Sequence, residues 1–128
     1  MKEKLGRGEW ILVVEDDQYV SDLLRSLLEV EGFNVVVASD GEEGERCYQS
    51  HQPRFDIVVT DLGLPKIGGV ELFHRLRSFN PSVKVIASSG YGHEIVVKQL
   101  LQDGAMGFVP KPFMPQELLK LIRGVLDA

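Results

Sequence analysis

Carboxylates follow directly after two short apolar runs of the chain. Trp10-Ile-Leu-Val-Val14 leads into Glu15-Asp16-Asp17, and Ile57-Val58-Val59 is followed by Thr60 and Asp61. A short apolar run bounded by turn residues is typical of a strand that is buried on both faces of a parallel sheet. In open α/β sheets, ligands bind at the edge formed by the carboxyl ends of such strands. The pattern therefore places these acidic side chains where a chemical site is expected.

Two of the acids also have a structural explanation. Asp17 is best explained as the N-cap of the helix that follows it, because its carboxylate can satisfy unpaired backbone N–H groups. Asp61 taken alone could stabilise the turn formed by Gly63 and Pro65, as Asp often does. Asp16 has no comparable structural role.

Polar groups follow two later apolar runs as well. Val83-Lys-Val-Ile-Ala87 leads into Ser88-Ser89, and Gly107-Phe-Val109 leads into Pro110-Lys111-Pro112. Parallel strands bring their carboxyl ends to one rim of the sheet. We therefore expect a serine hydroxyl and the Lys111 ammonium to join the carboxylates.

This combination of groups suits phosphoryl chemistry. Three carboxylates taken out of water together repel one another, and a divalent cation or a lysine relieves the repulsion. Ligation by oxygen alone indicates Mg²⁺, and the ammonium of Lys111 suits a phosphate or carboxylate oxygen. A carboxylate can act as a covalent nucleophile and form an aspartyl phosphate. The rim is thus predicted to accept a phosphoryl group.

Helical patterns alternate with the apolar runs. Apolar spacing and glycine or proline stops predict five strands and five helices, the fourth helix covering residues 93–103 and carrying β-branched residues between glycines. We expect that helix to be mobile. Strict alternation predicts an α/β fold with a parallel sheet covered by helices on both faces.

Length and composition limit the remaining possibilities. The 128 residues fit one domain, and the formal charge of −5 gives no electrostatic footprint for nucleic acid. No apolar run approaches a membrane span, and the charged residues 1–9 do not resemble a signal peptide. Cys47 is the only cysteine, which fits a reducing cytosol, and the three histidines are scattered. We expect residues 1–8 to be a solvated arm or linker and residues 9–128 to form the domain.

Taken in order, these motifs resemble a bacterial response-regulator receiver domain over residues 9–127. The resemblance is carried by motifs at the ends of four strands: Val13-Val14-Glu15-Asp16-Asp17, Asp61 with Leu64-Pro65 and Gly69, Ser89-Gly90, and Phe108-x-x-Lys111-Pro112. It implies a flavodoxin-like, doubly wound five-stranded parallel sheet in the order 2-1-3-4-5, with five helices.

The resemblance also implies a role for each acidic residue. Asp61 is the phosphoryl acceptor, Asp16 ligates Mg²⁺ directly, and Glu15 acts on the metal directly or through a water molecule. The backbone carbonyl of Gly63 completes the metal ligands supplied by the chain.

The remaining motif residues receive roles in the same way. Ser89 and Lys111 hold the phosphoryl oxygens, the Lys111-Pro112 peptide bond is cis, and Phe108 is the aromatic switch. Ser88 competes with Ser89 as the hydroxyl donor, and Ser89 is favoured by the following Gly90 and its spacing from Lys111.

Three positions bear on the lifetime of the phosphorylated state or depart from the family pattern. Gly63 stands where many relatives carry a side chain beside the phosphoryl group, and Gly68 stands where an aspartate is frequent. Tyr91 is expected to face the same region and to shield it.

The implied function is signalling rather than conventional enzyme turnover. A sensor histidine kinase or phosphotransfer protein would phosphorylate the domain in the cytoplasm, and the helix 4–strand 5–helix 5 face would serve as the output or homodimer surface. No membrane and no nucleic acid is expected as a partner of this domain. Some motifs also resemble receivers attached to hybrid sensor kinases.

Two other functions could use the same topology. A flavodoxin-like flavin carrier would need a Ser/Thr/Gly-rich loop after the first strand, where this chain has three acids. A stand-alone aspartate phosphatase would need a second catalytic aspartate soon after Asp61, where Leu62 and Gly63 stand.

Overall fold

The fold alternates strands and helices along the whole chain. The computed structural model describes residues 3–90 and 92–128. The strands are β1 Trp10–Val14, β2 Asn34–Ala38, β3 Ile57–Asp61, β4 Val85–Ser89 and β5 Gly107–Pro110. The helices are α1 Gln18–Val30, α2 Gly41–Gln49, α3 Gly69–Phe79, α4 Glu94–Gln102 and α5 Pro115–Leu126.

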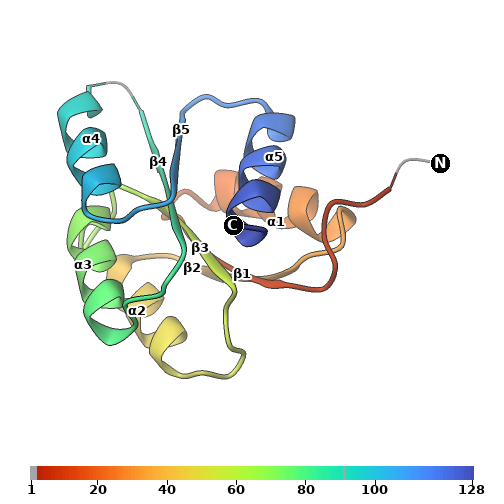
Figure 1. Ribbon diagram of the computed structural model, residues 1–128, viewed down its shortest axis with the longest axis horizontal. Helices are drawn as coiled ribbons and strands as arrows, with labels where there is room; N and C mark the ends of the chain where they lie inside the picture. Colours follow the sequence, from red (N-terminus) through yellow and green to blue (C-terminus); the bar gives the residue numbers. More distant parts are fainter. Residues whose placement is uncertain (1–2, 91) are drawn as a thin grey trace.

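The five strands form one parallel sheet in the order β2-β1-β3-β4-β5, which confirms the predicted topology. Figure 1 shows α1 and α5 on one face of the sheet and α2, α3 and α4 on the other. The register pairs Val14 with Thr60, Asp61 with Ser88, and Ser89 with Pro110. The carboxyl ends of β1, β3, β4 and β5 therefore meet at one rim.

The sheet separates two apolar clusters. Alternate residues of β1 point to opposite faces, so Ile11 and Val13 join the cluster beneath α1 and α5, whereas Leu12 and Val14 join the other. All four side chains are at most 1% exposed. Burial on both faces is the reason the strands read as continuous apolar runs.

Helix α1 begins and ends as its sequence predicted. The side chain of Asp17 accepts a hydrogen bond from the backbone N–H of Val20 at 3.1 Å, which confirms Asp17 as the N-cap. Gly32 follows the helix with a φ of +96°, a conformation that glycine adopts without the steric penalty of a Cβ atom. The Asp17 cap and Gly32 therefore determine where α1 begins and ends.

Residues 5–9 belong to the folded body. Gly6 and Gly8 donate backbone hydrogen bonds to Glu31 and Gly32, and Arg123 of α5 binds the carbonyl of Leu5 at 2.8 Å. Residues 5–8, which the sequence suggested as part of a solvated arm or linker, thus lie against the domain. The domain boundary near residue 8 stays a prediction.

Strand β4 begins later than its apolar pattern indicated. Val83 is buried, but its backbone N–H donates to the carbonyl of Asn80 at 3.0 Å, in the turn that follows α3. The hydrogen-bonded strand therefore starts at Val85 and extends through Ser88 and Ser89.

No helix in the described part of the chain is long and apolar enough to cross a membrane.

The start of α3 packs directly against the end of β3. A Cβ atom on Gly69 would lie 2.3 Å from the carbonyl oxygen of Asp61 and 2.6 Å from Cα of Leu62. Both of these atoms are backbone, so they cannot swing away as a flexible side chain would. Gly69 therefore allows the contact that holds Asp61 at the rim.

The Gly69→Ala substitution should destabilise the fold by about 1–3 kcal/mol, because the added methyl group overlaps backbone atoms. The neighbouring Gly68→Ala provides a matched control, since a Cβ there would meet only the carbonyl oxygen of Leu62, at 3.9 Å. The control should change stability by no more than about 1 kcal/mol, since Gly68 is the N-cap residue of α3 and alanine is a poorer N-cap than glycine. Urea unfolding of the two variants tests this, and equal effects would contradict the packing argument.

Candidate functional site

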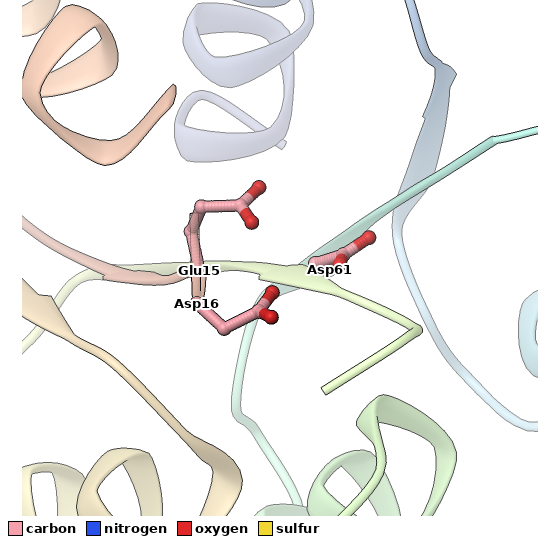
Figure 2. A group of neighbouring side chains, drawn as sticks. All are labelled: Glu15, Asp16 and Asp61. Carbon is pink, nitrogen blue, oxygen red and sulfur yellow. The ribbon is translucent and has the colours of Figure 1, made fainter. Parts of the chain in front are cut away.

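Three carboxylates converge at the rim. Glu15 and Asp16 follow β1, and Asp61 is the last residue of β3. One carboxylate oxygen from each lies within 4.8 Å of the others. Figure 2 shows the three groups directed towards the same space from the ends of neighbouring strands. The structure thus brings together the acids that the sequence singled out.

The three acids differ in their surroundings. Glu15 is only 4% exposed, and its Oε2 accepts a hydrogen bond from the backbone N–H of Asp17 at 3.1 Å. Its own backbone N–H donates to the carbonyl of Ala38 at 3.0 Å, which extends the β1–β2 pairing by one residue. Asp61 is half-buried and Asp16 is exposed. An incoming group would therefore reach Asp16 and Asp61 before Glu15.

Lys111 supplies the positive charge of the cluster. Its Nζ lies 2.6 Å from Oε1 of Glu15 and 3.5 Å from Oδ1 of Asp61. Burial alone would lower the pKa of Lys111, but the hydrogen bond to Glu15 and the charge of Asp61 outweigh it and raise the pKa. The side chain therefore stays charged at neutral pH. The Lys111-Pro112 peptide bond is cis, as the resemblance implied.

The chemistry of the acidic group fits a hard divalent cation. Oxygen ligands alone surround the space, in the arrangement that Mg²⁺ accepts when it retains water molecules. Gly63 lies beside this space, since a Cβ atom on it would be 3.8 Å from Oδ2 of Asp61 and would meet no other atom within 4 Å. The individual metal ligands, Glu15, Asp16, Asp61 and the Gly63 carbonyl, stay predictions.

The serine hydroxyls do not join the cluster. Ser89 is 1% exposed, and its Oγ donates a hydrogen bond to the carbonyl oxygen of Gly90 at 3.3 Å and is also hydrogen-bonded to Nδ1 of His93. Ser88 is also buried, and its Oγ has no hydrogen-bond partner among the described residues. The role of Ser89 as phosphoryl ligand stays a prediction, with Ser88 as the alternative.

Phe108 lies on the α4 side of the sheet. It is half-buried and packs against the apolar cluster that α2, α3 and α4 cover. A cavity of about 450 Å³ lies beside it, bordered by residues of α4, of β5 and of the loop before α4. Its role as a switch stays a prediction. Tyr91, which was expected to shield the site, lies outside the described residues.

His93 is the polar residue near the site that sequence reasoning missed. The scattered spacing of the histidines is unsuitable for a metal site, and the sequence pattern indicates no other role for them. The available signal was the distance of four residues between Ser89 and His93, across a segment that contains two glycines. Such a segment can turn back on itself, so a contact between the two side chains was feasible.

Comparison with known proteins gives consistent relatives. A model of the response regulator receiver domain matches residues 11–123. The chain is 33% identical to the chemotaxis protein CheY of Treponema pallidum over 117 residues, covering 91% of this chain and 81% of the relative. It is 37% identical to the transcriptional regulatory protein CpxR of Escherichia coli over 116 residues, covering 91% of this chain and 48% of CpxR. The chain thus spans about half the length of CpxR.

Solved structures agree with these relatives. A response regulator receiver domain protein from Clostridium thermocellum superposes with a TM-score of 0.89 at 28% identity, covering 93% of this chain and 94% of the other. A chain of the CheX–CheY–BeF₃–Mg²⁺ complex from Borrelia burgdorferi superposes with a TM-score of 0.86 at 33% identity, covering 91% and 88%.

The Lys111→Met substitution should lower stability by about 1–3 kcal/mol at neutral pH, because it leaves the buried Glu15 carboxylate without its cation. The pKa of Lys111 is raised in the folded state, so its contribution is fully present below the ordinary value of 10.5 and is lost as the pH rises through the folded-state value. The gap to the wild-type protein should therefore close only under alkaline conditions.

Urea unfolding in chelator-containing buffer, at neutral pH and at a pH above 10.5, checks this expectation. Lys120→Met on the exposed side of α5 is the matched control and should show little change at either pH. A gap that is equally large at both pH values would refute the charge-pair explanation.

Proposed function

The chain belongs to the response regulator receiver family, and from that premise we propose that Asp61 is its phosphoryl acceptor. Receiver domains serve two-component signalling and interact with histidine kinases and phosphotransfer proteins. The observation that carries the proposal is the position of Asp61, at a strand end, within 4.8 Å of two further carboxylates and 3.5 Å from the Lys111 ammonium. The phosphodonor would be the phosphohistidine of a sensor histidine kinase or phosphotransfer protein.

The transfer forms one bond and breaks another. A carboxylate oxygen of Asp61 attacks phosphorus, the P–N bond to the donor imidazole breaks, and the imidazole leaves with the electron pair and takes up a proton. The product is an aspartyl phosphate. Gly63 is exposed and leaves the space beside the carboxylate open, so water can reach the product. Hydrolysis of the aspartyl phosphate would return the domain to its unphosphorylated state. The domain would therefore not act as a conventional turnover enzyme.

Mg²⁺ is the proposed cofactor. When bound, it supplies positive charge between the carboxylates and the phosphoryl oxygens. Asp16 and Asp61 would hold it directly, Glu15 directly or through water, and Gly63 through its backbone carbonyl. This arrangement accounts for a rim on which three carboxylates meet and two of them are paired with Lys111.

The basic and hydroxyl groups would hold the phosphoryl oxygens. Lys111 already lies between Glu15 and Asp61, so a small movement of its Nζ reaches a phosphoryl group on Asp61. Ser89 would supply a second hydrogen bond from the end of β4. To do so it must give up its present contact with His93.

The proposed output is a change of the α4–β5–α5 face. Only Val97 and Leu100 of α4 are buried, whereas Ile95 is 85% exposed and Leu101 is 44% exposed. A shift of Ser89 would let Phe108 turn towards the space beneath α4. The exposed apolar side chains would then contact an output partner or a second copy of the chain. The domain would act in the cytoplasm and would not itself bind nucleic acid.

Incubation with acetyl phosphate and Mg²⁺ should add the mass of one phosphoryl group, and Asp61→Asn should abolish the addition because it removes the nucleophilic carboxylate. Asp22→Asn, on the exposed surface of α1, is the control and should label like the wild-type protein. Intact-protein mass spectrometry gives the result directly. Undiminished labelling of Asp61→Asn would rule out Asp61 as the acceptor.

Mg²⁺ should raise the melting temperature by relieving the repulsion among the three carboxylates. Binding at a hundred times the dissociation constant stabilises a fold by about 2.7 kcal/mol. Asp16→Asn removes a proposed direct ligand and should blunt the response, whereas Asp22→Asn should not. If Asp16→Asn responds to Mg²⁺ as strongly as the wild-type protein does, the cation binds elsewhere.

A further inference from the structure

The side chain of His93 connects the rim to α4. His93 is the N-cap residue of α4, yet its side chain makes no capping hydrogen bond to that helix. Its Nδ1 is instead hydrogen-bonded to Oγ of Ser89 at the end of β4. An exposed ring thus holds a hydroxyl that is 1% exposed.

This contact competes with the proposed role of Ser89. A serine hydroxyl has a single proton to donate. When the imidazole Nδ1 accepts that proton, the hydroxyl has none left for a phosphoryl oxygen. When Nδ1 carries a proton and donates it, the hydroxyl donates its own proton to the Gly90 carbonyl at 3.3 Å, and its oxygen is still held by His93.

We propose that His93 is a positioning residue that latches Ser89 to the start of α4 in the unphosphorylated protein and releases it on phosphorylation. The inference rests on the proposed role of Ser89 as a phosphoryl ligand and extends it. Phosphorylation would exchange the Ser89–His93 hydrogen bond for a bond between Ser89 and the phosphoryl group. The exchange would act on α4 directly, because His93 is the N-cap residue of that helix and its backbone carbonyl accepts a hydrogen bond from the N–H of Val97.

The surroundings of His93 favour such a coupling. His93 and Phe108 border the same cavity of about 450 Å³, so a released ring and the proposed switch residue adjoin one space. Helix α4 buries two side chains, Val97 and Leu100, whereas α5 buries four. The Ser89–His93 hydrogen bond thus adds a polar contact at the start of a helix that buries few side chains.

The latch has a measurable thermodynamic consequence. A bond that exists only in the unphosphorylated state lowers the affinity for a phosphoryl mimic, because binding must break it. His93→Ala should therefore bind beryllofluoride, in the presence of Mg²⁺, roughly three- to tenfold more tightly than the wild-type protein, a factor typical of one net hydrogen bond. His93→Asn places a hydrogen-bonding atom at the position of Nδ1 and should restore affinity close to that of the wild-type protein.

NMR titration with beryllofluoride reads both the affinity and the structural response. In the wild-type protein, amide shifts should change across residues 88–115, and the Nδ1 resonance of His93 should change with them. His74→Ala removes an exposed histidine of α3 whose Nε2 lies 3.8 Å from Asp103 at the other end of α4, and it should leave the affinity unchanged because this contact does not involve Ser89. In a Ser89→Ala background, His93→Ala should have no further effect, as expected when both act through one bond.

The outcomes separate the latch from the function on which it rests. Absence of any response in the wild-type protein would overturn the proposed phosphoacceptor function and the latch with it. A normal wild-type response combined with unchanged affinity in His93→Ala would overturn the latch alone. Tighter binding that persists in the Ser89→Ala background would also overturn it, because His93 would then act through α4 packing.

Discussion

Electrostatic repulsion at the carboxyl end of the sheet is the constraint on which the structure depends. Parallel strands place Glu15, Asp16 and Asp61 together, and Glu15 is almost completely buried. A buried carboxylate is tolerated only with a hydrogen-bonded partner of opposite charge, and Lys111 is that partner. Among the described residues, Lys111 forms ion pairs with Glu15 and Asp61 but not with Asp16, so the rim keeps an excess of negative charge. This excess of negative charge destabilises the folded state, and it would favour the binding of a cation.

The rim is rigid on one side and open on the other. Near β1 and β3, backbone packs against backbone: a Cβ atom on Gly41 would lie 2.0 Å from the carbonyl of Ile67, and one on Gly69 would overlap Asp61. After β4 the surroundings are open, since Gly90 has no atom within 4 Å of such a position and Gly92 has a φ of +95°. The ends of β1 and β3 that carry the carboxylates are thus closely packed, whereas Gly90 and Gly92 have open space beside them.

The features that depend only on residues close together in the chain were predicted from the sequence. The apolar runs, the Asp17 cap and the glycine after α1 specify their elements within a few residues, and the order of strands followed from the family resemblance. The start of β4 was misplaced because the N–H of Val83 is used by the preceding turn. The pairing of residues 5–9 with the chain near Glu31 spans about 25 residues and has no apolar periodicity to reveal it. The Ser89–His93 contact depends on a loop conformation, which residue types alone do not specify.

The two donors proposed to hold the phosphoryl group are mechanically linked. The backbone N–H of Lys111 donates to the carbonyl of Ser89 at 2.8 Å, so a hydrogen bond joins the ends of β4 and β5. The side chains of both residues are also proposed to bind the same phosphoryl group. Negative charge added to Asp61 attracts both donors at once, and neither strand end can move far without the other. The most weakly anchored neighbour of these strand ends is α4, which buries two side chains and is tied to Ser89 through His93. Under the proposed function, a local change of charge at Asp61 would therefore move one helix, while β1 and β3 would keep the carboxylates in place.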